Sequence, residues 1–235
     1  MDYSINYGAN KIQFSLARKL RKTIKISVGS DLKVMVIAHA RLPFLKIKEH
    51  VQKKARWINK KLNYFKGLPP KMPPRELVSG ETHMYLGRQY RLKVKKAKEP
   101  SVKLKGAYIY LSTNGQSSKK YKQMLLSEWY KLRAMTRYKD VLNKFYERLS
   151  KYEILKPSLG TRQLKTRWGS FSKKRNTVML NTELIKAPSH CIEYVVMHEL
   201  CHAKYLKHDK SFYGFLSRIM PDWRKRKERL ERVVI

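Results

Sequence analysis

The sequence has 235 residues and a formal net charge of +37, because 54 lysines and arginines stand against 17 acidic residues. Its hydrophobic content of 42% indicates a folded chain with a sizeable core, and no segment has the run of about eighteen apolar residues that a membrane-spanning helix needs. The positive surplus favours nucleic acid as a partner over a membrane surface, since no single amphipathic helix carries the charge.

The first part of the chain predicts one hairpin and one helix. Residues 15–22 are basic and fit a short helix or a basic arm. Residues 23–28 and 32–37 alternate apolar and polar side chains around a turn at 29–31, which predicts a β-hairpin. From residue 43 to residue 65 apolar side chains recur every three or four positions, so one amphipathic helix with a basic outer face is expected.

The middle of the chain predicts a linker, a sheet and a long helix. Prolines at 69–74 predict a stiff linker. Residues 76–111 predict a small β-sheet whose hairpin turns fall at 87–88 and 105–106. Residues 119–152 predict a helix that packs behind the next helical segment. The expected apolar stripe of this helix consists of Tyr121, Leu125, Trp129, Leu132, Tyr138, Leu142, Phe145 and Leu149.

A second hairpin is expected from strands at 168–172 and 177–181, after the chain is broken by Pro157 and Gly160. An edge strand can hold an extended peptide by backbone pairing. The predicted substrate-binding residues in this hairpin are Trp168, Gly169, Ser170 and Asn181.

The next helix, which Ser189 is expected to cap, carries His198, Glu199 and His202 in a His-Glu-x-x-His motif. Residues four apart lie one turn apart on the same helix face, so the two imidazoles aim at one point and Glu199 lies beside them. Neutral nitrogen donors next to a carboxylate base are typical of a hydrolytic zinc site.

His208 is the predicted third ligand. It lies six residues beyond His202, about 240° round a continuous helix, so the helix must end near 205–207 and the chain must turn back. Glu228 and Glu231 on the last helix are the competing ligands, because zinc sites with two histidines and one glutamate also occur.

Two further helices are expected after this turn. Asp209 is a good N-cap for a helix that ends at Pro221, and a last basic helix follows at 222–234. Cys191 and Cys201 are ten residues apart on one predicted helix, about 15 Å along its axis, which is too far for a disulfide. Unpaired thiols, together with an N-terminus that has no secretory leader, indicate a cytoplasmic protein.

Several stretches of the sequence resemble the YgjP-like metallopeptidase family, which is related to the SprT-like zinc proteases. The weaker matches are Arg21-Lys22-Thr23-Ile24, Trp57-Ile58, Gly80-Glu81 and Tyr85-Leu86-Gly87. The specific matches are Thr166-Arg167-Trp168-Gly169-Ser170, Asn181, Leu184, Pro188, the stretch from Tyr194 to His202, His208, Phe212, Pro221 and Leu230.

The resemblance implies that His198, His202 and His208 bind one Zn²⁺ and that Glu199 is the general base. It also implies a minimal zincin fold. The family usually has a cysteine after Trp-Gly-Ser, where this sequence has Phe171. Relatives of the SprT type cut proteins attached to DNA, a setting that suits the positive charge.

We therefore expect an α+β protein with an N-terminal β-rich subdomain at 1–115 and a zincin-like catalytic domain at 116–235. The expected function is a zinc metallopeptidase that acts on a protein or peptide and is recruited to nucleic acid. The alternatives are a metal-dependent phosphohydrolase of the UTP type and a nucleic-acid-binding module with a structural zinc. The candidates for stabilising an oxyanion are His190, His83, Arg167 and Tyr205.

Overall fold

The computed structural model divides into two units, Met1–Pro70 and Lys71–Ile235. The expected boundary after residue 115 does not coincide with this division, since the sheet at 82–113 shares its buried core with the C-terminal helices. The proline-rich segment that we predicted to be a linker lies outside the described residues. The structure describes residues 2–8, 10–29, 31–67, 75–115, 118–164 and 166–233.

The first unit contains a four-stranded sheet with the order β1-β2-β4-β3. Its strands are β1 (Asp2–Tyr7), β2 (Asn10–Lys19), β3 (Lys25–Val28) and β4 (Val34–His39). The antiparallel β3–β4 pair confirms the predicted hairpin.

Residues 15–19 belong to strand β2, so the prediction of a helix or basic arm at 15–22 is wrong. The strand pairs in parallel with β4, and the Arg18 guanidinium donates to the carbonyls of His39, Ala40 and Leu42 at 3.3, 2.8 and 2.8 Å. These partners lie more than twenty residues away in the sequence, and their contacts override the local helical pattern.

Two helices, α1 (Phe44–Lys53) and α2 (Ala55–Lys66), replace the single helix predicted at 43–65. At Lys54 the backbone leaves the helical region, and its N–H is shared between the carbonyls of His50 and Val51. The apolar stripe nevertheless continues through both helices and is buried against the sheet. Its buried members are Ile47, Val51, Ala55 and Ile58.

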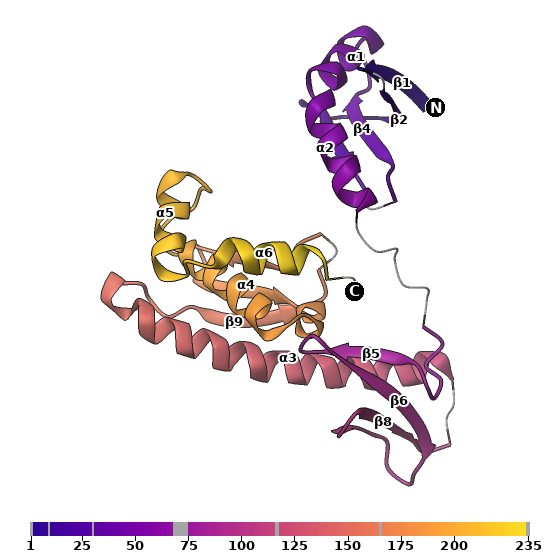
Figure 1. Cartoon of the computed structure of the whole chain (residues 1–235), viewed down its shortest axis with the longest axis vertical. Helices are drawn as coiled ribbons and strands as arrows, with labels where there is room; N and C mark the ends of the chain where they lie inside the picture. Colours follow the sequence, from indigo (N-terminus) through magenta and orange to yellow (C-terminus); the bar gives the residue numbers. More distant parts are fainter. Residues whose placement is uncertain are drawn as a thin grey trace. The chain divides into compact units, whose positions relative to one another are not determined.

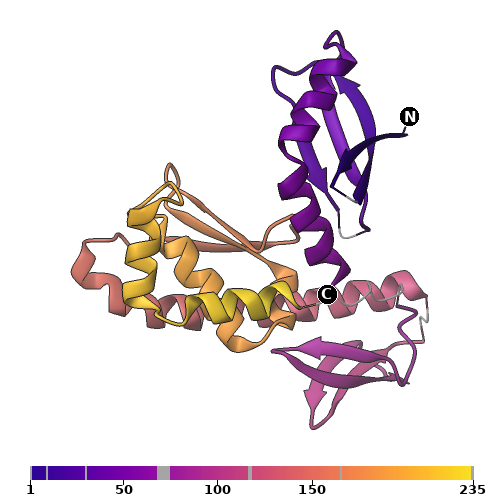
Figure 2. The same cartoon turned by 45° about the horizontal axis from the view of Figure 1, so that its top comes forward.

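The second unit begins with a four-stranded sheet of order β5-β6-β8-β7. Its strands are β5 (Thr82–Tyr85), β6 (Arg88–Lys96), β7 (Ser101–Lys105) and β8 (Tyr108–Thr113). The two antiparallel pairs, β5–β6 and β7–β8, confirm the predicted hairpins. The β6–β8 pair is parallel, and Figures 1 and 2 show that this sheet lies beside the N-terminal half of α3.

The long helix α3 (Lys119–Leu149) and a short 3-10 turn, η1 (Ser150–Tyr152), confirm the predicted helix at 119–152. Its predicted apolar stripe is only partly correct. Leu132 is 67% exposed, whereas Leu126, Tyr130 and Ala134 are buried. The helix packs against different elements along its length, so its buried face is not one straight stripe.

A three-stranded sheet of order β10-β11-β9 precedes the C-terminal helices. It consists of β9 (Ser158–Arg162), β10 (Gly169–Ser172) and β11 (Thr177–Asn181). The antiparallel β10–β11 pair confirms the second hairpin, and β9 adds a parallel strand that the sequence did not predict.

The chain ends with the 3-10 turn η2 (Thr182–Lys186) and the helices α4 (Ser189–Cys201), α5 (Lys210–Ile219) and α6 (Trp223–Glu231). Pro188, and not Ser189, is the capping residue of α4, and it makes no side-chain cap bond. Both cysteines are buried and free, as predicted. The structure therefore has the mixed α+β composition that we expected.

None of the described helices is at once long enough and apolar enough to cross a membrane.

Candidate metal centre

Helix α4 presents the first two histidines. His198 lies in its last turn and His202 is its C-capping residue, so the helix ends earlier than the predicted 205–207. The N–H groups of Lys204 and Tyr205 then donate to the carbonyl of Cys201 and close a tight turn. The chain can turn back here because these bonds satisfy a carbonyl at the helix end.

This turn returns His208 to the first two histidines, directly before α5. The carboxylate of Asp209 accepts the Phe212 N–H at 3.0 Å, which confirms the predicted N-cap. This cap fixes the start of α5 at Lys210, and with it the backbone next to His208.

The rings of His198, His202 and His208 converge. One nitrogen of each lies within 4.8 Å of the others, and His198 Nε2 is 2.9 Å from His208 Nε2. The ring centroids of these three residues are 4.6 to 5.1 Å apart. The centroid of the Phe212 ring lies 4.7 to 5.0 Å from those of all three imidazoles, so Phe212 packs against each of them.

The surroundings of His198 and His208 favour neutral imidazole rings. His202 Nδ1 lies 2.9 Å from the Tyr205 carbonyl, which only accepts, so in the neutral ring Nδ1 carries the proton and Nε2 has the lone pair. Burial, reinforced by the neighbouring histidines, lowers the pKa of His198 to about 3. Burial also lowers the pKa of His208. Neutral imidazoles are the species that ligate zinc.

The competing ligands Glu228 and Glu231 do not join this cluster. Among the described residues, the group that could hold a metal contains the three histidines alone. Glu231 forms an ion pair with Lys227 at 3.9 Å within α6. Of the alternatives weighed, His208 is thus the third side chain that converges with His198 and His202.

Glu199 is buried beside the histidines, with only 6% of the residue exposed. Burial raises the pKa of its carboxyl to about 7, and the Arg167 guanidinium acts in the opposite direction. Strand β10 approaches closely here: a Cβ on Gly169 would lie 2.8 Å from Glu199 Oε1 and 2.9 Å from Cγ. Only glycine leaves room for the carboxylate in this position.

A cleft of about 320 Å³ opens over the histidines. Strand β10 forms one wall of the cleft, and β10 is an edge strand of its sheet. The cleft is lined by Arg167, Gly169, Ser170, Phe171, His198, Glu199, His202, Leu206 and His208. The predicted substrate residues Gly169 and Ser170 therefore face this cleft.

The other two predicted substrate residues lie elsewhere. Trp168 packs against the core. Asn181 is buried, and its amide donates to the carbonyls of Leu164 and Arg167 at 2.8 and 3.1 Å and accepts from the Glu183 N–H at 3.1 Å. Because its side-chain amide is already hydrogen-bonded to the backbone, Asn181 positions the segment that leads to β10.

A family model for the YgjP-like metallopeptidase domain matches residues 22–233. The chain belongs to the YgjP-like metallopeptidase family. It is therefore a hydrolase of the metallopeptidase class, and the match extends over most of both units.

Solved structures similar to this YgjP-like chain include two metallopeptidase zymogens. Abylysin of Pyrococcus abyssi is 22% identical, with a TM-score of 0.36, over 40% of this chain and 90% of its own. Jannalysin of Methanocaldococcus jannaschii is 22% identical, with a TM-score of 0.34, over 40% of this chain and 92% of its own. No curated protein matches the sequence.

Of the four oxyanion candidates in this YgjP-like chain, Arg167 lines the cleft. Tyr205 uses its carbonyl for His202 and packs its ring 5.5 Å from that of Phe215. His190 is exposed, and its carbonyl accepts from Arg226.

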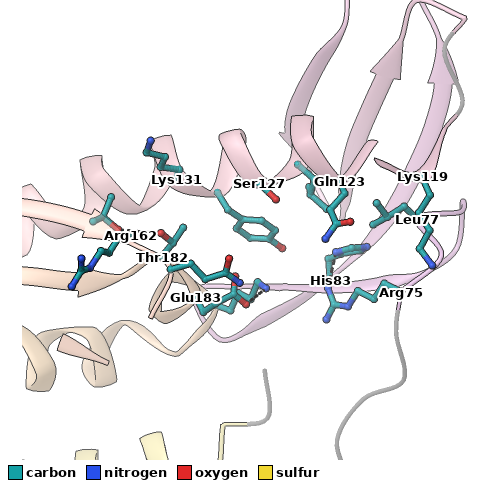
Figure 3. A pocket seen from close by; sticks show the side chains of 15 residues that line it. Arg75, Leu77, His83, Lys119, Gln123, Ser127, Lys131, Arg162, Thr182 and Glu183 are labelled. Carbon is teal, nitrogen blue, oxygen red and sulfur yellow. Dashed lines mark hydrogen bonds and ion pairs between the residues drawn. The ribbon is translucent and has the colours of Figure 1, made fainter. Parts of the chain in front are cut away.

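The fourth candidate, His83, lines a different cavity of about 740 Å³ between α3, η2 and the segment around residue 80 (Figure 3). It is fully buried there, and Arg75 approaches its Nδ1 at 2.7 Å. Burial, with Arg75 as the next cause, lowers the pKa of His83 to about 4. In the same cavity the Tyr130 hydroxyl donates to the Met84 carbonyl at 2.8 Å.

Sequence reasoning missed two functional features of the site. Phe212 follows His208 by four residues, but a phenylalanine at helical spacing reads as core. Gly169 was expected to contact a substrate, whereas its lack of a side chain also makes space for Glu199. The family resemblance included Phe212 but did not indicate its contact with the three imidazoles, and no sequence pattern indicated the approach of Gly169 to Glu199.

Proposed function

We propose that the chain is a zinc-dependent peptidase whose active site is the cleft between α4 and β10. The observation that supports this function is the convergence of His198, His202 and His208 next to the buried carboxylate of Glu199. We also propose that β9–β11, α4 and α3 form a minimal zincin-like core.

The three histidines fit a catalytic zinc ion. Their nitrogen donors suit zinc better than magnesium, which prefers oxygen. Structural zinc sites usually have four protein ligands, whereas the described cluster offers three. One zinc ion per chain is proposed; when bound, it lowers the pKa of a coordinated water to about 7 and polarises a carbonyl.

Glu199 is the proposed general base. Its carboxyl, with a pKa of about 7, can accept and release a proton near neutral pH. It takes the proton from the attacking water at a carboxylate oxygen. It then delivers this proton to the leaving amine nitrogen, so one residue serves both halves of the reaction.

Strand β10 is the proposed site for the substrate backbone. Its outer edge can pair with an extended peptide, which brings a carbonyl towards the histidines. Phe171 gives the cleft an apolar wall where the family usually has a cysteine. Among the described residues that line the cleft, Arg167 is the one lysine or arginine. We propose that its guanidinium balances negative charge on the substrate.

The test is Glu199→Gln. We expect the variant to bind zinc as the wild type does and to lose casein cleavage by about 10³-fold, because general bases contribute on this scale. Zinc content and proteolysis are measured on the same preparation, with UTP hydrolysis in parallel. Undiminished proteolysis by the variant, or brisk UTP hydrolysis with intact casein, would overturn the proposed function.

We further propose that the protein is recruited to nucleic acid by its positive surface. The support is the net charge of +37 that remains after the 17 acidic residues offset part of the 54 basic ones. Binding by charge falls steeply with salt because counterions are released. An affinity for DNA or RNA that does not change between low and physiological salt contradicts this part of the proposal.

A further inference from the structure

The outer face of the β5–β8 sheet carries aromatic side chains. Along β8, Ile109 and Leu111 point inwards and are fully buried in the core. Tyr108 and Tyr110 alternate with them and stay partly exposed on the opposite face. Their ring centroids are 6.0 Å apart, so the two rings form one short row.

Each tyrosine lies between two cations from the neighbouring strands. Tyr108 is opposite Arg91 of β6 and Lys105 of β7. Tyr110 is opposite Lys93 and Lys103 in the same strands. These four basic side chains are exposed. The register therefore builds a basic face with two aromatic rings along its centre, which we call the tyrosine face.

The cations and rings of the tyrosine face are in contact. Lys93 Nζ lies 3.8 Å from the Tyr108 ring centroid and 5.8 Å from that of Tyr110. Lys95 Nζ lies 5.4 Å from the Tyr110 centroid. A positive charge held beside an aromatic ring can meet a phosphate while the ring meets a base.

The tyrosine face is also hollowed. A depression of about 920 Å³ lies over part of this face. It is lined by Tyr110 and Ser112 of β8, Lys95 of β6, Lys103 and Lys105 of β7, and Lys98 and Glu99 between β6 and β7. Four lysines thus stand against one acidic side chain in its described lining. The hollow has the volume of a small-molecule site and a charge complementary to a phosphate.

We propose that the tyrosine face binds single-stranded nucleic acid, with bases stacked on Tyr108 and Tyr110 and phosphates paired with the flanking cations. The inference rests on the proposed recruitment to nucleic acid and names its surface. Stacking on a protein ring requires an unpaired base, so a single strand fits this face better than a duplex. A membrane fits less well, because no exposed large apolar side chain occurs on β6, β7 or β8.

The test is the affinity of the full chain for a labelled single-stranded oligonucleotide of mixed sequence, measured by fluorescence anisotropy. The double variant Tyr108→Leu/Tyr110→Leu removes both rings and keeps apolar side chains in the strand. We expect it to bind at least about tenfold more weakly, because two bases lose the rings on which they stack. The variant Tyr108→Phe/Tyr110→Phe should bind within about twofold of the wild type, because stacking needs the ring alone.

The contribution of charge is tested by comparing two double variants. Lys103→Ala/Lys105→Ala removes two lysines of the tyrosine face, and the control Lys46→Ala/Lys48→Ala removes two exposed lysines of α1. Both remove two charges, and the β7 pair should weaken binding more. Equal losses for the two pairs, unchanged binding by the leucine variant, or equal affinity for a duplex overturns the proposal. So does stronger binding to phosphatidylserine vesicles that depends on the same tyrosines.

The leucine variant should cleave casein like the wild type, because neither tyrosine lines the histidine cleft. Oligonucleotide binding needs no peptidase activity. A failed stacking test with intact proteolysis therefore rejects the tyrosine face alone, whereas intact binding without proteolysis rejects the peptidase.

Discussion

The second unit has two hollows, the histidine cleft and the cavity of Figure 3. They differ in the interaction partners of their polar atoms. The cavity is larger, about 740 Å³ against about 320 Å³. Several of its polar groups have protein partners: Lys186 pairs with Glu183, the Tyr130 hydroxyl donates to the Met84 carbonyl, and Arg75 lies 2.7 Å from His83 Nδ1. The buried His83 Nε2 lies 3.5 Å from Glu81 and makes no hydrogen bond to the described residues. In the cleft, three nitrogens point at one another around a common centre.

Cavity volume alone does not identify the candidate metal centre, because the three converging imidazoles line the smaller hollow. A hydrogen bond between His198 Nε2 and His208 Nε2 can satisfy two of the three nitrogens at best, because each neutral ring has one donor and one acceptor. A cation that accepts three lone pairs satisfies all of them. Three converging ring nitrogens therefore make the smaller hollow the better candidate for binding a cation.

The largest expected effect comes from His208→Ala. Removing one of three ligands should weaken zinc binding by more than about 100-fold, since even an outer partner of a metal ligand is worth that much. Lys131→Ala, in the lining of the larger cavity, should leave zinc content unchanged. Metal analysis after dialysis measures both. Full zinc retention by His208→Ala would show that the two hollows do not differ as we infer.

A smaller effect is expected from Gly169→Ala, because the new Cβ meets the Glu199 carboxylate. A displacement of about 1 Å at a catalytic group costs up to about 100-fold in kcat, so kcat should fall while zinc content stays constant. The matched control is Gly214→Ala in α5, where a Cβ meets nothing within 4 Å. It should keep full activity and gain up to about 1 kcal/mol in stability. Equal kcat for both variants contradicts the steric role of Gly169.

The smallest effect concerns stability at the wall of the larger cavity. The Gly87 N–H donates to the Lys186 carbonyl at 3.0 Å, and a Cβ on Gly87 would lie 2.8 Å from Pro188 at the start of α4. Gly87→Ala should lower the unfolding free energy by about 1 kcal/mol for its positive φ and by about 1–3 kcal/mol more for the clash.

Gly106→Ala is the control for this stability measurement. Gly106 also has a positive φ, but nothing lies within 4 Å of its Cβ position. Gly106→Ala should therefore lower the unfolding free energy only by the about 1 kcal/mol that a positive φ costs. Urea unfolding measures this change, and the m value should stay the same. If both glycine variants lose the same stability, the contact with Pro188 does not support α4.

Local patterns predicted the elements whose partners are close in sequence. The hairpins, α3 and the helix of the histidine motif follow from alternation and helical periodicity. The parallel pairs β2–β4, β6–β8 and β9–β11 were not predicted, because each joins strands separated by other structure. The exposed position of Leu132 shows the same limit, since the burial of one helix face depends on distant partners.

The convergence of His198 and His202 was predictable because four-residue spacing fixes the geometry on a helix. The return of His208 required a turn whose length the sequence suggested only through the need for a third ligand. Asn181 could not be placed correctly, since a buried amide that organises a loop and an amide that binds substrate have the same sequence signature. Its four backbone contacts became visible only in the fold.

Helix α3 has 31 residues and is thus about 46 Å long. The tyrosine face belongs to a sheet beside its N-terminal half, and the same helix contacts α4 further along (Figure 1). The helix therefore separates the two proposed sites along one rigid element. If both proposals hold, a protein held on a bound nucleic-acid strand must present an extended segment that reaches from the tyrosine face to the histidine cleft.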